Sequence, residues 1–304
     1  MYKYNEKKEK IIIPSPIITE VPFDMKLLEH LEPFEREWVL SFISKIKEKN
    51  SAWNFSTLYK NLETLTFKKS NLAKEQCSGL YDMNKNQIKY RTSTSVFHEL
   101  IHASTSCIIG KRYFCGFEQI KKGVPTVTIG KGLNEGYTNY QESKYDTCHG
   151  WYIPEMDIAK NLNKPVPTME ELYNNMDLLG LILYLEKYTS KKETINFIEM
   201  LDYIHAYQLR LNTASSKEII DLYYECQLYT FGCMITKLLQ DIENHKVTSE
   251  EAQKRLNIMM HLTLTIIMTG DKMEEVSQLE KLQTQIPDLS HISKEDIKTY
   301  RLKL

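Results

Sequence analysis

The stretch Phe97-His98-Glu99-Leu100-Ile101-His102-Ala103 decides how the rest of the chain is interpreted. It reads H-E-x-x-H between apolar residues, and we expect it to be helical. Because an α-helix brings residues four positions apart to one face, His98 and His102 can direct two imidazoles at one metal ion. Glu99 lies beside that ion rather than bound to it. Two nitrogen ligands and a carboxylate that can take a proton from water are typical of a zinc hydrolase.

The composition is that of a globular protein. The chain has 304 residues, of which 42% are hydrophobic and 26% are charged, and its formal net charge is −1. This length suffices for one large domain or two ordinary ones. The balanced charge gives no general basic field, so nothing in the composition favours a nucleic-acid partner.

The cysteines and the N-terminal sequence predict a cytoplasmic protein. The six cysteines form no C-x-x-C pair, and a chain of this size does not need the disulfides of small secreted proteins, so we expect free thiols. The apolar run at 11–13 is too short for a signal peptide, and Pro14 and Pro16 interrupt it. No later apolar run is long enough to span a bilayer, so no membrane segment is expected. Export without a signal peptide stays open.

Before the H-E-x-x-H stretch, the sequence passes from an extended arm to helices. Residues 1–24 contain three prolines and predict an arm without regular structure. Residues 25–49 have apolar residues at helical spacing, which Pro33 divides into two helices. Ser56 can cap a short helix that follows.

Strand patterns then lead into the H-E-x-x-H helix. Residues 64–68 predict a strand, and residues 79–91 predict a hairpin. Such a hairpin can hold an extended peptide through main-chain hydrogen bonds, or it can be an ordinary part of a small sheet. Hydroxyl side chains at 92–95 can cap the helix, which we expect to bury Ile108 and to stop at Gly110.

The rest of the chain predicts an α+β fold with a large helical region. Residues 111–132 predict loops and one further strand. Helical patterns follow at 154–162, 168–188, 192–211, 216–241, 248–268, 272–284 and 293–302, and Thr248 and Glu251 have the spacing of a capping box. We therefore expect an N-terminal arm and helices over 1–63, a core with a small, mostly antiparallel sheet over 64–150, and a helical C-terminal region over 151–304.

A second motif supplies a candidate third ligand. Catalytic zinc takes three protein ligands and one water, so two histidines leave one protein ligand to find. Gly132-Leu133-Asn134-Glu135-Gly136-Tyr137-Thr138 opens a predicted helix. Together with H-E-x-x-H it resembles the gluzincin metallopeptidases, in which the glutamate of a downstream N-E motif is the third ligand. The resemblance covers roughly residues 78–142. It implies a zincin-like core, a zinc cofactor held by His98, His102 and Glu135, and a peptide or protein substrate.

The chain departs from the gluzincin pattern in three ways. The interval between His102 and Glu135 is longer than in familiar members. Asn139 stands where thermolysin-like sequences have an aspartate that supports a zinc-bound histidine. An amide can accept the same hydrogen bond, but it carries no charge. The G-x-M-E-N signature of aminopeptidases is absent, so the motifs give no support for recognition of a free N-terminus.

The catalytic residues are predicted from the needs of peptide hydrolysis. Glu99 is the expected general base, which takes a proton from water and gives it to the leaving amine. A donor to the oxyanion is also needed, and Tyr137, Tyr140 and His149 are the nearest candidates in the sequence. Among them, Tyr137 and His149 are included in the predicted catalytic set.

Other interpretations stay open. Four further residues are candidate third ligands: Glu118, Glu142, Asp146 and His149. The remaining histidines, His205 among them, form no ligand spacing and are interpreted as structural. The predicted function is that of a zinc-dependent metallopeptidase. The alternatives are a regulatory metallopeptidase that cleaves one specific intracellular partner, and a non-enzymatic helical protein with a structural metal or none.

Overall fold

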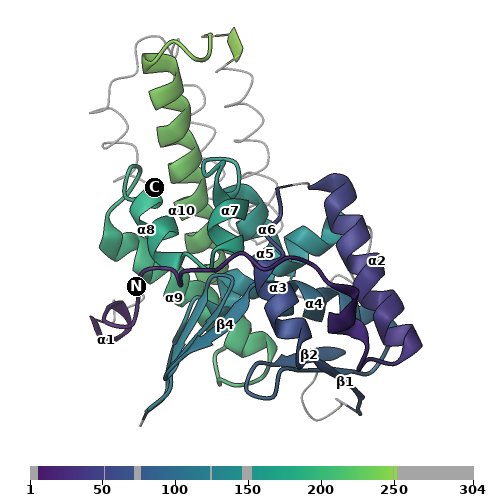
Figure 1. Cartoon of the computed structure of the whole chain (residues 1–304). Helices are drawn as coiled ribbons and strands as arrows, with labels where there is room; N and C mark the ends of the chain where they lie inside the picture. Colours follow the sequence, from purple (N-terminus) through teal and green to yellow (C-terminus); the bar gives the residue numbers. More distant parts are fainter. Residues whose placement is uncertain are drawn as a thin grey trace.

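The computed structural model describes residues 6–50, 52–71, 77–123, 125–145, 153–248 and 250–251. Within them the chain has a mixed fold in which two small sheets lie among helices (Figure 1). This agrees with the predicted α+β class. The helices predicted after residue 251 lie outside the described residues.

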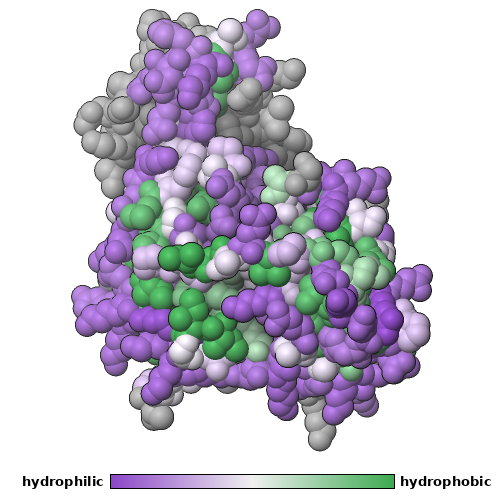
Figure 2. Space-filling view, in the orientation of Figure 1, coloured by the Kyte–Doolittle hydropathy of each residue, from purple (hydrophilic) through white to green (hydrophobic). Residues whose placement is uncertain are grey.

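The N-terminal segment is the predicted extended arm, and it crosses one face of the molecule. After α1 (Glu6–Glu9), residues 12–24 run without helix or strand. Arg112 donates a hydrogen bond to the carbonyl of Ile11 (3.1 Å), and Gln119 makes two hydrogen bonds of 3.0 Å with the backbone of Ile13. Hydrophobic residues gather across the middle of this face, where the purple arm runs (Figures 1 and 2).

Three helical elements follow the arm: η1 (Met25–Leu28), α2 (Pro33–Lys49) and α3 (Ser56–Leu62). Pro33 separates the first two, as predicted, because proline fits the first position of a helix. The predicted cap at Ser56 is wrong. Its hydroxyl accepts a hydrogen bond from the Val21 N–H (3.3 Å) and so holds the arm, while Asn54 accepts from the Ser56 N–H (2.9 Å).

The first sheet has three strands in the order β1-β3-β2. They are β1 (Thr66–Lys69), β2 (Gly79–Asp82) and β3 (Gln87–Tyr90). Strands β2 and β3 form the predicted antiparallel hairpin, with Tyr81 opposite Ile88, and β1 is parallel to β3. Strand β2 is therefore an edge strand, and it packs against the H-E-x-x-H helix α4 (Val96–Ser104).

Helix α4 begins differently from the prediction. The turn η2 (Ser93–Ser95) leads directly into it, and no side chain caps its first turn. The Ser95 hydroxyl donates instead to the carbonyls of Ser78 and Thr92, at 2.9 Å each. Ser95 therefore ties the start of α4 to the residue that precedes β2.

Helix α4 also ends earlier than predicted. It stops at Ser104, and the β-branched residues that follow form a strand, in which Ile108 is 43% exposed rather than buried. Gly110 has a φ of 60°, a value that glycine adopts without strain. It serves a hairpin turn between two strands and not the end of a helix.

The second sheet is a four-stranded antiparallel meander where one strand was predicted. Its strands are β4 (Ser106–Ile109), β5 (Arg112–Cys115), β6 (Glu118–Lys121) and β7 (Val127–Ile129). Each has three or four residues, which is too short for an alternating pattern to stand out in the sequence. Tight turns join the first three strands, and the turn glycines Gly110 and Gly116 both have positive φ.

Six helices complete the described chain: α5 (Lys131–Ser143), α6 (Ile153–Leu162), α7 (Met169–Asn174), α8 (Leu178–Leu185), α9 (Lys191–Gln208) and α10 (Ser216–Glu243). The helix predicted over 168–188 is two helices, because Met176 has a φ of 55° and Asp177 caps α8 by accepting from the Gly180 N–H (2.8 Å). In the predicted capping pair, the Glu251 N–H donates to Thr248 (3.2 Å). The cysteines of the described part are free, as predicted. None of the described helices has the length and apolar character needed to cross a membrane.

Candidate metal centre

Helix α4 presents the two histidines of H-E-x-x-H on one face. Val96, Leu100 and Ile101 are buried on its other faces, so the helix has a fixed orientation. His98 and His102 are one turn apart, and their Nε2 atoms are 3.1 Å from each other. The pairing predicted from helical spacing is confirmed.

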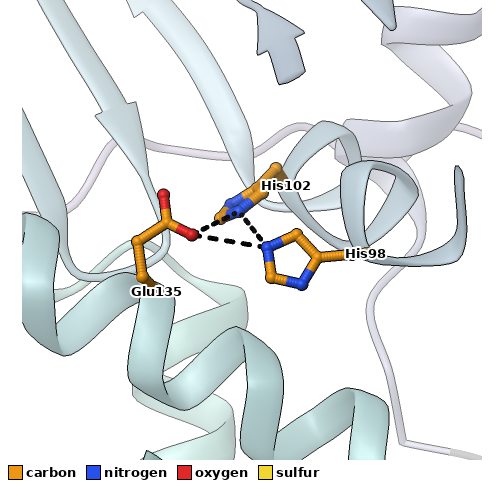
Figure 3. A group of neighbouring side chains, drawn as sticks. All are labelled: His98, His102 and Glu135. Atoms are coloured by element: carbon orange, nitrogen blue, oxygen red, sulfur yellow. Dashed lines mark hydrogen bonds and ion pairs between the residues drawn. The ribbon is translucent and has the colours of Figure 1, made fainter. Parts of the chain in front are cut away.

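Helix α5 brings Glu135 to the two imidazoles (Figure 3). Glu135 Oε2 lies 3.3 Å from His98 Nε2 and 3.4 Å from His102 Nε2. These three residues form a group of ligand atoms within 4.8 Å of one another that could hold a metal ion. The predicted ligand set is therefore brought together by two separate helices.

The spacing of the donor atoms fits a small tetrahedral ion. Around zinc, with bonds of about 2.0–2.1 Å, neighbouring ligand atoms are about 3.3 Å apart. The three donor separations here are 3.1, 3.3 and 3.4 Å. Two imidazoles and one carboxylate are also a donor set that zinc prefers. The donor separations and the donor types thus fit zinc.

Two glycines of the second motif fix the position of α5. A Cβ on Gly132 would lie 2.2 Å from the carbonyl oxygen of Leu201 in α9, and a Cβ on Gly136 would lie 2.4 Å from that of Glu155 in α6. Helix α5 therefore contacts the backbones of two other helices directly. This close packing determines which way Glu135, between the two glycines, points.

The N-terminus of α5 is held by an aspartate of α9. Gly130 has a φ of 84°, and its N–H donates to Asp202 Oδ2 (3.0 Å), while the Gly132 N–H donates to Asp202 Oδ1 (2.9 Å). A carboxylate at this position satisfies two backbone groups that a helix start leaves open. Asp202 thus anchors the start of the helix that carries Glu135.

The second nitrogen of each histidine has its own partner. His98 Nδ1 lies 3.2 Å from Glu142 Oε2, and His102 Nδ1 lies 3.4 Å from the sulfur of Cys115. A carboxylate in this position fixes the imidazole ring and strengthens it as a ligand. Glu142 is one helical turn beyond Asn139, so the supporting carboxylate lies three positions later than the gluzincin pattern implies.

Replacing Glu142 should weaken metal binding. The Glu142→Gln variant keeps the size of the side chain but removes its charge, and we expect a zinc affinity about 10- to 100-fold lower. A competition titration with a chromogenic chelator measures this affinity. Glu37→Gln, an exposed substitution on α2, is the control and should bind zinc like the unmodified chain. Equal affinities for the two variants would contradict the supporting role of Glu142.

Glu99 lies next to the metal donors but is not one of them. It is 5% exposed, and its carboxylate accepts a hydrogen bond from the backbone of Tyr81 in β2. A Cβ on Gly79 would lie 2.6 Å from Glu99 Oε1, so the missing side chain at Gly79 leaves the space that this carboxylate occupies. Burial raises the pKa of Glu99. These features suit a group that must accept a proton.

Opposite charges at the centre stabilise one another. Burial lowers the pKa of His98, but its hydrogen bonds to Glu135 and Glu142 outweigh that effect and raise it to about 9. Burial likewise lowers and Glu135 raises the pKa of His102, with the balance well above its usual value. Burial raises the pKa of Glu135, yet the two histidines hold it well below its usual range. The two imidazoles and the carboxylate of Glu135 therefore stabilise one another's charged forms.

A cavity of about 290 Å³ opens over the donor atoms. Its wall is formed by residues of β2 and the segment before it, of α4, β5, β6 and α5, and of the end of α9. His205 of α9 is in this wall, is 2% exposed, and has its Nδ1 atom 3.5 Å from Glu155 Oε1. The interpretation of His205 as only structural missed this position. No ligand spacing could have revealed it, since α9 is far from the motifs in sequence.

The other predicted site residues lie elsewhere or outside the description. Tyr137 is fully buried, its hydroxyl donates to Asn163 (3.3 Å), and it is not among the residues that line the cavity. It is two positions after Glu135, which turns it to another face of α5. His149 and Asp146 lie outside the described residues. Glu118 and Glu142 line the cavity but are not in the donor group, which leaves Glu135 as the third member.

Comparisons with protein-family models, with curated proteins and with solved structures find no match to the chain. The assignment of a function therefore depends on the geometry of this site.

Proposed function

We propose that the protein is a zinc-dependent peptidase that uses His98, His102 and Glu135 as ligands and Glu99 as general base. One observation supports this most strongly. Glu99 is buried beside three converging donors but does not belong to them, and it lines the same cavity. A structural zinc site has four protein ligands and no need for an adjacent carboxylate, whereas a catalytic site keeps one position open.

The residues of the cavity have separate roles in the proposed hydrolysis. Zinc, when bound, would lower the pKa of a water molecule to about 7 and polarise the scissile carbonyl. Glu99 takes the proton of the attacking water and then delivers it to the leaving amine. Glu142 and Cys115 keep the two imidazoles in the orientation that the ligands require.

His205 is the proposed donor to the oxyanion. Peptide hydrolysis places negative charge on the carbonyl oxygen, and a fixed donor in a water-poor cavity stabilises that charge. His205 lines the cavity, and its Nδ1 atom lies 3.5 Å from Glu155 Oε1. It replaces Tyr137 in this role, because the hydroxyl of Tyr137 is bound to Asn163.

The proposal is tested by hydrolysis with and without metal. The full chain, loaded with zinc, is incubated with a mixture of short unstructured peptides, and the products are identified by mass spectrometry. We expect cleavage that stops with a strong chelator and returns when zinc is added. Cleavage that resists the chelator would contradict the proposal. A chain that holds one zinc and cuts no peptide would favour a partner-specific regulatory peptidase or a structural metal.

A further inference from the structure

Strand β6 places a second kind of carboxylate in the wall of the cavity. Side chains of a strand alternate between its two faces, so Glu118 and Ile120 face the cavity, while Gln119 faces away and binds the arm at Ile13. Glu118 is 7% exposed. It does not belong to the group of metal donors. It is therefore a buried acidic group to which the proposed hydrolysis assigns no role.

Among the described residues, none makes a direct contact that satisfies the carboxylate of Glu118. Neither a hydrogen bond nor an ion pair reaches its carboxylate from any residue that the structure describes. Its neighbours differ in this respect, because Asp202 accepts two backbone N–H groups and Glu142 contacts His98. Removing a carboxylate from water without a new partner is costly. A carboxylate kept in this state is suited to a partner that comes from outside.

The charges around Glu118 favour a cationic partner. Lys131 is the described cation with the largest effect on Glu118, and Glu118, Glu135 and Asp202 all act on Lys131 in turn. Lys8 lies 3.8 Å from both Asp202 and Glu199. With Glu135 engaged at the metal centre, the carboxylates of Glu118, Asp202 and Glu199 therefore remain against the two lysines Lys8 and Lys131. A negatively charged ligand would add to this excess of negative charge, whereas a positively charged ligand would supply the partner that Glu118 lacks.

We propose that Glu118 binds an ammonium group of the substrate, which is either a lysine side chain or a free α-ammonium. The proposal rests on the proposed peptidase function and names its substrate class. Glu118 and the metal donors line one cavity of about 290 Å³. The ammonium group would thus belong to a residue at or next to the bond at the metal centre.

Binding to an inactive form of the full chain tests the proposal without relying on hydrolysis. Zinc-loaded Glu99→Gln protein is titrated with short peptides in a calorimeter. The peptides carry lysine, norleucine or glutamate at one position, each with a free or an acetylated N-terminus. The same titrations are made with Glu99→Gln/Glu118→Gln, with Glu99→Gln/Glu118→Asp, and with Glu99→Gln/Glu37→Gln as the control. Zinc content and the unfolding midpoint show that each variant is folded and loaded.

We expect the ammonium-bearing peptides to bind about 10- to 100-fold more tightly than their neutral counterparts, as a charged hydrogen bond in a buried site allows. Glu118→Gln should abolish this difference, while Glu118→Asp and the control should retain it. A difference that depends on acetylation identifies the α-ammonium, and one that depends on lysine against norleucine identifies the side chain. Equal affinities, tighter binding of glutamate peptides, a preference that survives in Glu118→Gln, or no binding of any peptide would overturn the proposal. If the preference is found but the unmodified chain cuts none of these peptides, the proposed hydrolysis fails and the role of Glu118 in binding stands.

Discussion

The Glu99→Gln variant is expected to lose peptide hydrolysis almost completely while it keeps its zinc. Glutamine has the same shape as glutamate and can still accept the hydrogen bond from the backbone of Tyr81, so the fold around α4 should not change. It cannot take a proton from water. Removal of a general base typically slows a reaction by about 10²–10⁴-fold. The turnover number, measured on any peptide that the unmodified chain cleaves, should fall by this factor.

Measuring the zinc content shows whether the loss of hydrolysis is caused by the missing base or by loss of the metal. Glu99 is outside the donor group, so the variant should hold as much zinc as the unmodified chain. Glu37→Gln on α2 should cleave peptides at the normal rate. If Glu99→Gln retained hydrolysis within a factor of two or three, Glu99 would not be the base, and the proposed chemistry would be wrong.

The Gly136→Val variant is expected to destabilise the whole centre. A Cβ at this position would lie 2.4 Å from the carbonyl oxygen of Glu155 and 2.5 Å from its carbonyl carbon, so the backbones of α5 and α6 must move apart. Replacing a helical glycine normally stabilises a helix by up to about 1 kcal/mol. Overpacking against a backbone costs about 1–3 kcal/mol or more, and valine adds two further methyl groups. The net effect of the substitution should therefore be a lower free energy of unfolding.

Denaturant unfolding gives the free energy for this comparison. Gly136→Val should unfold at a clearly lower denaturant concentration and bind zinc more weakly, because Glu135 moves with α5. Gly123→Ala is the matched control, since the added Cβ would meet nothing closer than 3.7 Å, and its stability should change by less than about 0.5 kcal/mol. Normal stability and zinc binding in Gly136→Val would show that the close packing of α5 does not position the third ligand.

Two of the three candidate metal donors could be predicted because helical geometry brings them together locally. His98 and His102 are one turn apart on any helix, and Glu135 was found because its flanking residues resemble a known motif. The same sequence segment contains Gly132 and Gly136, whose packing role is evident only when α6 and α9 are present. The motif thus contains both a candidate metal ligand, Glu135, and the glycines that allow α5 to pack closely enough to position it.

Other parts of the site could not be predicted, since they depend on distant segments. Cys115 lies in β5 and Glu118 in β6, strands of four residues in which alternation is too brief to detect. Glu118 was a candidate ligand in the sequence, but its position in the cavity wall outside the donor group was not predicted. His205 reaches the cavity from a helix that no motif links to the centre. The end of α4 was misplaced because Gly110 supplies a positive φ to a hairpin turn as readily as to the end of a helix.

The zinc content of the purified full chain, measured beside that of Glu135→Ala, shows whether His98, His102 and Glu135 hold a metal ion. Metal is determined by elemental analysis after exposure to zinc and removal of the excess. We predict one equivalent of bound zinc per unmodified chain and much weaker zinc binding by the variant, because the variant loses one of three protein ligands. No bound zinc in the unmodified chain would contradict the account. Zinc held equally by both proteins would keep the metal but exclude Glu135 as its ligand.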